Sequence, residues 1–154
     1  MISTRREIRS IRNTMGNKRI ASVLVPYKIV GKEIFVYLQK RTEDAERFPG
    51  CFGLFGGGIE SNESPEEALK REIKEELDFI PEHYEFLGVY EFEREDTRHV
   101  YLLEVQGDFE STITVLEGEC GRYFSEKEVL GESKIIGGDK VILEDVFSRV
   151  RNRI

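Results

Sequence analysis

Two spacings of apolar residues recur along the chain, and each predicts a different kind of element. A Val-, Ile- and Tyr-rich stretch broken at Gly31 predicts two antiparallel strands, at about 20–30 and 34–40. Two later stretches of the same kind, at about 84–94 and 98–106, are joined by polar residues and predict two more strands. The predicted strands therefore fall into an early pair and a late pair.

Between the two pairs, the spacing changes to that of a helix. Ser64 is a good N-cap, Pro65 suits the first helical position, and Glu67 completes a capping box. The helix is therefore predicted to begin at Ser64 or Pro65. Its apolar stripe consists of Leu69, Ile73 and Leu77.

Three further helices follow from capping residues. Thr4 and Glu7 begin a short N-terminal helix, and Ser125 caps a short helix over 126–130. Asp139 is expected to cap the last helix. The apolar stripe of that helix is Leu143, Val146, Phe147, Val150 and Ile154. Strands on both sides of a central helix favour the α/β or α+β class.

The central helix also has an acidic edge, formed by Glu72, Glu75 and Glu76 beside the apolar stripe. Such an edge is often only a solvated face, or a surface that contacts another protein. Clustered carboxylates repel one another unless a cation lies among them, and hard oxygen ligands suit Mg²⁺ or Mn²⁺. The glycines at 56–58, just before the helix, allow the backbone to approach an ion closely.

The stretch from Gly57 to Phe79 resembles the Nudix box, with matching residue types at eight of nine signature positions across 23 residues. Asp78 stands where the signature has glycine. Asp tolerates the left-handed conformation that ends a helix, so the departure concerns the exit of the helix and not the acidic edge. The matching residues are Gly57, Glu63, Arg71, Glu72, Ile73, Glu75, Glu76 and Phe79.

This resemblance implies a Nudix hydrolase: a single domain over residues 1–154, with a mixed β-sheet sandwiched between α-helices and a box at 57–79 that binds Mg²⁺ or Mn²⁺. It also implies that Gly56 offers its backbone C=O to the metal and that Arg71 forms a structural ion pair with Glu63. The expected catalytic set is Glu72, Glu75, Glu76 and Arg71, with the three acids as metal ligands. Among them, Glu72 is the first candidate for the general base.

A loop glutamate after the box is the second candidate. The segment at 117–125 resembles the MutT-like segment in which a glutamate precedes an aromatic strand. By that match Glu117 is the expected extra metal ligand or base, with Glu119 as the alternative. A solvated loop acid is the competing explanation for both.

Candidates for substrate contacts lie outside the box. Arg41 follows the second predicted strand and is expected to reach phosphate or base, unless it is only a surface charge. Tyr90, Phe92 and Arg94 alternate along one strand, so Phe92 either contacts a nucleobase or packs in the core. Arg98 resembles a basic position in MutT-like relatives, which implies a substrate contact.

Composition limits the partners. The net charge of −7 argues against binding a nucleic-acid polymer, which relies on Lys and Arg. No apolar run approaches the roughly 20 residues that cross a membrane. Cys51 and Cys120 lack the spacing of a metal site and are expected to be free thiols in the cytoplasm. Many relatives form pairs, so a homodimer is an open expectation.

The resemblance thus implies hydrolysis of the diphosphate in a nucleoside diphosphate linked to another group. The expected substrate is a small nucleotide, either a nucleoside triphosphate or an oxidised nucleotide, as for MutT. The alternatives are a nucleotide sugar such as NDP-mannose, or a non-catalytic nucleotide-binding module.

Overall fold

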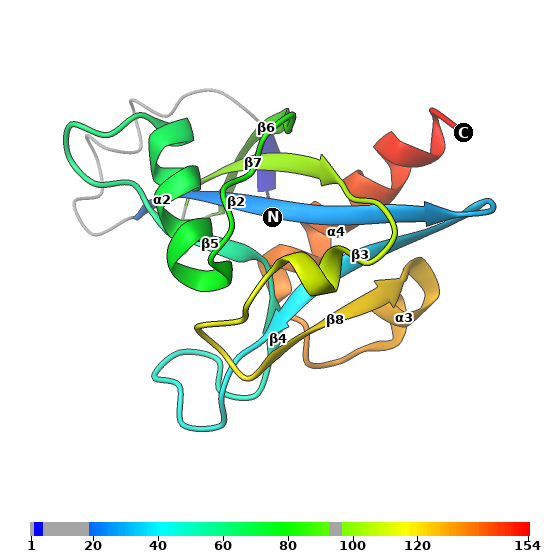
Figure 1. Cartoon of the computed structure of the whole chain (residues 1–154), viewed down its shortest axis with the longest axis horizontal. Coiled ribbons are helices and arrows are strands. Elements are labelled where there is room, and N and C mark those ends of the chain that lie inside the picture. Colours follow the sequence, from blue (N-terminus) through cyan, green and yellow to red (C-terminus); the bar gives the residue numbers. More distant parts are fainter. Residues whose placement is uncertain (1, 5–18, 93–96) are drawn as a thin grey trace.

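The structure is a computed structural model that describes residues 2–4, 19–92 and 97–154. In these residues one mixed sheet of eight strands is flanked by helices (Figure 1). The strands are β1 (Ile2–Thr4), β2 (Ile20–Val30), β3 (Glu33–Lys40), β4 (Phe52–Gly53), β5 (Phe55–Gly58), β6 (Glu85–Phe92), β7 (Thr97–Glu104) and β8 (Cys120–Ser125). The helices are α2 (Pro65–Leu77), α3 (Glu126–Gly131), α4 (Gly137–Arg151) and the 3-10 turn η1 (Phe109–Thr112).

Strand β2 is central to the sheet. One of its edges runs parallel to β7 from Ile20 to Tyr27. Its other edge is shared, because β5 pairs with its first half and β3 pairs with its last residues. Beyond that hairpin, this edge of β3 pairs with β4, while the opposite edge of β3 pairs with β8. The segment at 52–58, here called the crossover, therefore leads from β3 to β2 and carries the glycines to the middle of the sheet.

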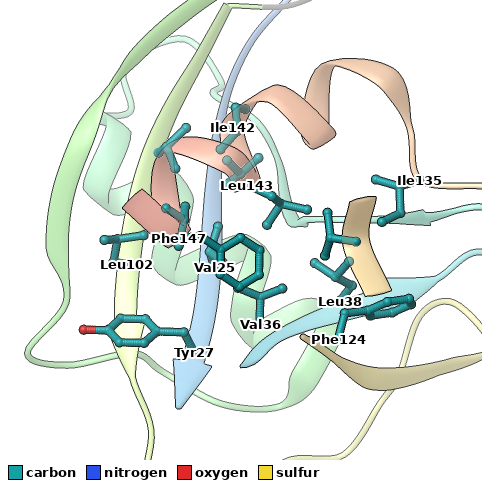
Figure 2. Close-up of a cluster of buried hydrophobic side chains, with 14 of the residues drawn as sticks. Val25, Tyr27, Val36, Leu38, Leu102, Phe124, Ile135, Ile142, Leu143 and Phe147 are labelled. Carbon is teal, nitrogen blue, oxygen red and sulfur yellow. The ribbon is translucent and has the colours of Figure 1, made fainter. Parts of the chain in front are cut away.

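Successive residues of β2 point to opposite faces of the sheet, as strand geometry requires. Val23 and Val25 belong to the cluster beneath α4, whereas Leu24 belongs to the cluster beneath α2. Figure 2 shows the first cluster, and Figure 1 shows α2 in front of the sheet with α4 behind it. Helix α4 contributes Ile142, Leu143, Val146, Phe147 and Val150 to that cluster. Helices cover both faces, so the predicted α+β sandwich is confirmed.

Most of the predicted elements are confirmed within a few residues. Helix α2 begins with the complete capping box of Ser64 and Glu67 and ends at Asp78, which has the left-handed conformation (φ 51°). Ser125 and Glu128 form a second capping box at the start of α3. The four predicted strands correspond to β2, β3, β6 and β7. The helix expected from Thr4 falls on residues outside the described ranges.

Two predictions for the last helix are wrong. Asp139 is not the cap: Ile136 occupies that position without a capping side-chain bond, and Asp139 lies inside the first turn, where it is 2% exposed. Ile154 was expected in the apolar stripe, but it follows the end of α4 and is 52% exposed. Helix α4 thus begins and ends earlier in the sequence than predicted.

Two further observations concern composition. Cys51 and Cys120 are both free, as expected. Across the described residues, no helix combines the length and the apolar character needed to span a membrane.

Candidate active site

The crossover places two glycines where a side chain has no room. Gly56 has φ 134°, and a Cβ there would lie 2.1 Å from the carbonyl oxygen of Ser22. A Cβ on Gly57 would lie 2.4 Å from the carboxyl carbon of Glu72. The Gly56 N–H donates to Oε1 of Glu76 (2.9 Å). The glycines therefore allow the acidic edge of α2 to contact the crossover backbone directly.

Arg71 organises the other side of this loop. Its guanidinium donates to both carboxylate oxygens of Glu63 (2.7 and 3.0 Å), to Glu72 (2.9 Å) and to the carbonyl of Gly58 (2.9 Å). The hydrogen bonds from Arg71 lower the pKa of Glu63 to about 2. The expected ion pair between Arg71 and Glu63 is present, and the same guanidinium also holds Glu72.

Four carboxylates share one electrostatic environment. Glu76 is 6% exposed, and burial raises its pKa to about 8; the charges of Glu117, Glu72 and Glu75 add to the rise, and the Gly56 N–H opposes it. Burial also raises the pKa of Glu117, with further contributions from Glu72 and Glu75. Folding thus brings Glu117, which is distant in sequence, beside the acidic edge of α2.

Two cavities adjoin the crossover, and they differ in charge. The first, of about 160 Å³, is lined by Glu76 and Glu117 and is here called the acidic cavity. The second, of about 150 Å³, is here called the arginine cavity because its lining includes Arg19, Arg41, Arg47 and Arg98. Arg41, Leu54 and Gly56 line both cavities. A ligand that passes over the crossover would therefore contact both.

A buried ion pair closes one side of the arginine cavity. Arg98 pairs with Asp139, and their side chains are 11% and 3% exposed. The other carboxylate oxygen of Asp139 accepts a hydrogen bond from the Leu54 N–H (3.1 Å). The first turn of α4 is thereby attached to the crossover and to β7.

Comparison with known proteins identifies the family. The NUDIX domain profile matches residues 18–145. The chain belongs to the Nudix family. The box, the fold and the position of the acidic edge on α2 all agree with that membership.

Two curated relatives match over shorter stretches of this Nudix chain. An ADP-ribose pyrophosphatase of Methanocaldococcus jannaschii is 42% identical over 84 residues, which cover 51% of this chain and 48% of that protein. Nucleoside triphosphatase NudI of Escherichia coli is 58% identical over 40 residues, which cover 26% of this chain and 28% of that protein. The matched regions thus span about half or less of these relatives.

Solved Nudix structures share the fold over most of the chain. The NUDIX domain of Shewanella oneidensis NrtR, complexed with ADP ribose, has a TM-score of 0.71 at 17% identity and covers 95% of this chain and 99% of that chain. A MutT NUDIX hydrolase from Burkholderia pseudomallei has a TM-score of 0.63 at 25% identity, covering 83% and 97%.

The acids of the Nudix box do not converge in this structure. Across the described ranges, no three Asp, Glu, His or Cys side chains lie close enough together to hold a metal ion as they stand. Glu72 contacts Arg71, Glu75 lies 3.5 Å from it, and Glu76 accepts from Gly56. The donor chemistry nevertheless fits Mg²⁺ or Mn²⁺, because a buried carboxylate surrounded by like charges is stabilised by a cation.

The residues predicted to contact substrate or metal outside the box differ in their position relative to the two cavities. Arg41 lines both cavities, and its Nε donates to the carbonyl of Arg47 (2.6 Å). Arg98 lines the arginine cavity. Glu119 lies 3.3 Å from Lys40 instead of lining the acidic cavity, so Glu117 is the better placed of the two loop acids.

The assignment of Phe92 to substrate binding is corrected by burial. Phe92 is 6% exposed and belongs to the cluster beneath α4, with the Arg98 guanidinium 5.6 Å from its ring centroid. Tyr90 lies in the same cluster. Neither ring offers a face to a nucleobase, and Arg94 lies outside the described residues. Packing is the role of both aromatic residues.

Three residues of the site were missed in the sequence. Arg19 precedes the first predicted strand, Arg47 lies in a polar loop, and Asp139 was assigned to a helix cap. None carries a local pattern that distinguishes it from a surface charge. Only the arrangement of β2, the crossover and α4 brings them together.

Proposed function

We propose that the protein is a divalent-cation-dependent Nudix pyrophosphohydrolase that cleaves the diphosphate of a nucleoside diphosphate linked to another group. The observation that supports this most is the arrangement of Glu72, Glu76 and Glu117 around the glycine crossover, next to a cavity lined by arginines. The charge of Glu75 acts on Glu76 and Glu117. The arginines can bind negative groups of a ligand, and the acids can bind a positive ion.

In this proposal the acids of α2 and the Gly56 carbonyl would hold Mg²⁺ or Mn²⁺. When bound, such an ion neutralises charge on diphosphate oxygens and makes a bound water more acidic. Arg71, paired with Glu63, holds Glu72 beside the crossover. Glu72 or Glu117 would accept the proton of the attacking water. Arg41 contacts the phosphates from the boundary between the two cavities.

Nucleoside triphosphates are the first substrate class to test. A second class, nucleoside diphosphates joined to a sugar, is favoured by the similarity to the ADP-ribose pyrophosphatase, which extends over 84 residues and therefore beyond the box. The box itself handles only the diphosphate that both classes share.

The test is an assay of the purified protein with Mg²⁺ or Mn²⁺ against nucleoside triphosphates, oxidised nucleoside triphosphates, ADP-ribose, nucleotide sugars and dinucleotides. We expect turnover of at least one class, and loss of that turnover in EDTA. The turnover should also be lost in Glu76→Gln, for which Glu66→Gln is the matched control on the same helix, since Glu66 accepts a hydrogen bond from the Tyr84 hydroxyl and lies away from the acidic edge. Thermal stabilisation by nucleotides without any turnover would instead indicate a non-catalytic binding module.

A further inference from the structure

The arginine cavity holds more positive charge than the described residues neutralise. Of its four arginines, only Arg98 forms an ion pair in the described part of the chain. Arg19, Arg41 and Arg47 have no carboxylate of a described residue within 4.0 Å, and Asp139, the acid of the cavity wall, is engaged by Arg98. Three guanidinium groups thus face one small cavity in a protein of net charge −7.

Each of these three guanidinium groups has a contact other than an ion pair. The guanidinium of Arg19 lies against Gly58, where a Cβ would be 3.1 Å from its Nη2. The Arg47 guanidinium lies 5.4 Å from the ring centroid of Phe48, which is 40% exposed. Arg41 is held by the backbone carbonyl of Arg47. These contacts orient the arginines without neutralising them.

The acidic cavity on the other side of Gly56 has the opposite character, since Glu76 and Glu117 line it. A cation bound among the acids offsets the charge of the diphosphate that is cleaved. A group that enters the arginine cavity instead meets the guanidinium groups of Arg19, Arg41 and Arg47, which form no ion pair with a described residue. A neutral sugar does not satisfy three guanidinium groups, whereas a phosphate accepts charge-assisted and bidentate hydrogen bonds from them.

We propose that the arginine cavity binds a phosphate group beyond the diphosphate that is cleaved, with Arg19 and Arg47 as residues that determine specificity. This inference rests on the proposed function and makes it narrower, because it predicts a preference for nucleoside triphosphates over ADP-ribose. With ATP, water adds to phosphorus, one P–O–P bond breaks, and the products are AMP and pyrophosphate. The additional phosphate leaves as part of the pyrophosphate.

The experiment compares kcat/KM for ATP and ADP-ribose, which share the nucleoside, in the wild type, Arg19→Gln and Arg47→Gln. Loss of one charge-assisted contact to phosphate should lower the ratio of kcat/KM for ATP to that for ADP-ribose by about tenfold. The change should appear mainly in KM for ATP, since the contact exists in the ground state as well. Arg47→Lys should restore part of the ratio, because it keeps the charge and loses the bidentate geometry.

Arg151→Gln is the matched control. Arg151, at the C-terminal end of α4, pairs with Glu126 of α3 and should leave the ratio unchanged. Thermal unfolding of every variant shows whether the fold is retained. An equal fall of both kcat/KM values, a larger fall for ADP-ribose, or no change in either would overturn the proposal.

A second measurement separates this inference from the proposed function. Inorganic triphosphate is titrated calorimetrically into the wild type and the Arg variants in EDTA, without metal. We expect binding that weakens by about tenfold in Arg47→Gln and does not change in Arg151→Gln. If the wild type hydrolyses nothing but this pattern holds, the proposed function fails and the phosphate site stands. If the wild type does not bind triphosphate, or the variants bind equally well, the phosphate site is refuted.

Discussion

Helices α2 and α4 both begin with acidic residues in the first turn, but these residues have different partners. In α2, Glu67 bonds to the N-cap backbone while Ser64 accepts from the Glu67 N–H (3.1 Å), so the helix stabilises its own end. In α4, no side chain caps the helix, and Asp139 contacts Arg98 and the Leu54 N–H. An acidic residue in the first turn thus caps the helix in α2, whereas in α4 it attaches the helix to the crossover and to β7.

This difference predicts how each helix start responds to mutation. Removal of a local cap affects one helix end, whereas removal of a buried tertiary partner leaves another charge without its counterpart. The substitutions below test the two starts and the acidic edge that α2 carries.

The largest effect on stability is expected for Asp139→Ala. This change leaves Arg98, whose side chain is 11% exposed, without its partner, and also removes the acceptor of the Leu54 N–H. Breaking a buried pair in this way costs about 3 to 5 kcal/mol of unfolding free energy. Urea denaturation followed by circular dichroism measures it.

Glu144→Ala is the control, since Glu144 is exposed on the same helix. Adding Arg98→Met to Asp139→Ala should recover part of the loss, because no buried charge then remains unpaired. A loss for Asp139→Ala no larger than that for Glu144→Ala would show that the ion pair does not hold α4 to the crossover.

The largest effect on activity is expected for Glu76→Gln. The substituted amide oxygen can still accept the Gly56 N–H, but the carboxylate expected to bind the metal is gone. We expect kcat to fall by about 100-fold or more, because a bound metal supplies several kcal/mol of transition-state stabilisation. Steady-state assays with Mg²⁺ measure the change.

In EDTA, the melting temperature of Glu76→Gln should equal or exceed that of the wild type, since a buried carboxylate among like charges is removed. The increase in melting temperature that Mg²⁺ gives the wild type should disappear in the variant. Full activity in Glu76→Gln would show that Glu76 is not a metal ligand.

A smaller effect is expected for Ser64→Ala at the start of α2. The substitution removes the side chain that accepts the Glu67 N–H, and loss of such a cap costs about 1 kcal/mol. Ser148→Ala, at an exposed position inside α4, should be neutral or slightly stabilising, because alanine favours helix interiors. Equal destabilisation in the two variants would indicate that the capping box contributes nothing specific.

The smallest effect is expected from the pH dependence of Glu63. Its pKa is lowered to about 2 by Arg71, from 4.5, so the ion pair stabilises the fold above about pH 4.5 and this contribution is lost as the pH falls towards 2. Glu63→Gln should therefore be less stable than the wild type at pH 7, and the difference should shrink towards pH 2. Urea titrations at several pH values test this, and a constant difference would contradict it.

The features that the sequence predicts well depend on neighbours along the chain. The capping box at Ser64, the left-handed Asp78 and the extent of β2 are set by residues a few positions away. The ion pair of Arg71 with Glu63 also belongs to this group, since the box fixes their spacing and the structure contains the pair. Local propensity and spacing decide such features before any tertiary contact forms.

The features that were missed depend on contacts distant in sequence. Asp139 was predicted to cap a helix, but it binds Arg98 of β7 and the Leu54 N–H of the crossover. The substrate role of Phe92 fails for a related reason, because the cluster under α4 buries its ring. Arg47 belongs to no periodic pattern in the sequence, so its place in the arginine cavity is known only from the structure. The spacing of residues along the chain does not predict side-chain contacts that form only when the sheet assembles.

The crossover connects the two faces of the sheet through two amides that lie two residues apart. The Leu54 N–H binds a carboxylate of α4, and the Gly56 N–H binds a carboxylate of α2. Loosening either helix exposes one of these amides to solvent and strains the other through the short peptide between them. Deuterium exchange at Leu54 and Gly56 would thus occur as one cooperative opening event, and it would report simultaneously on two helices that lie on opposite faces of the sheet.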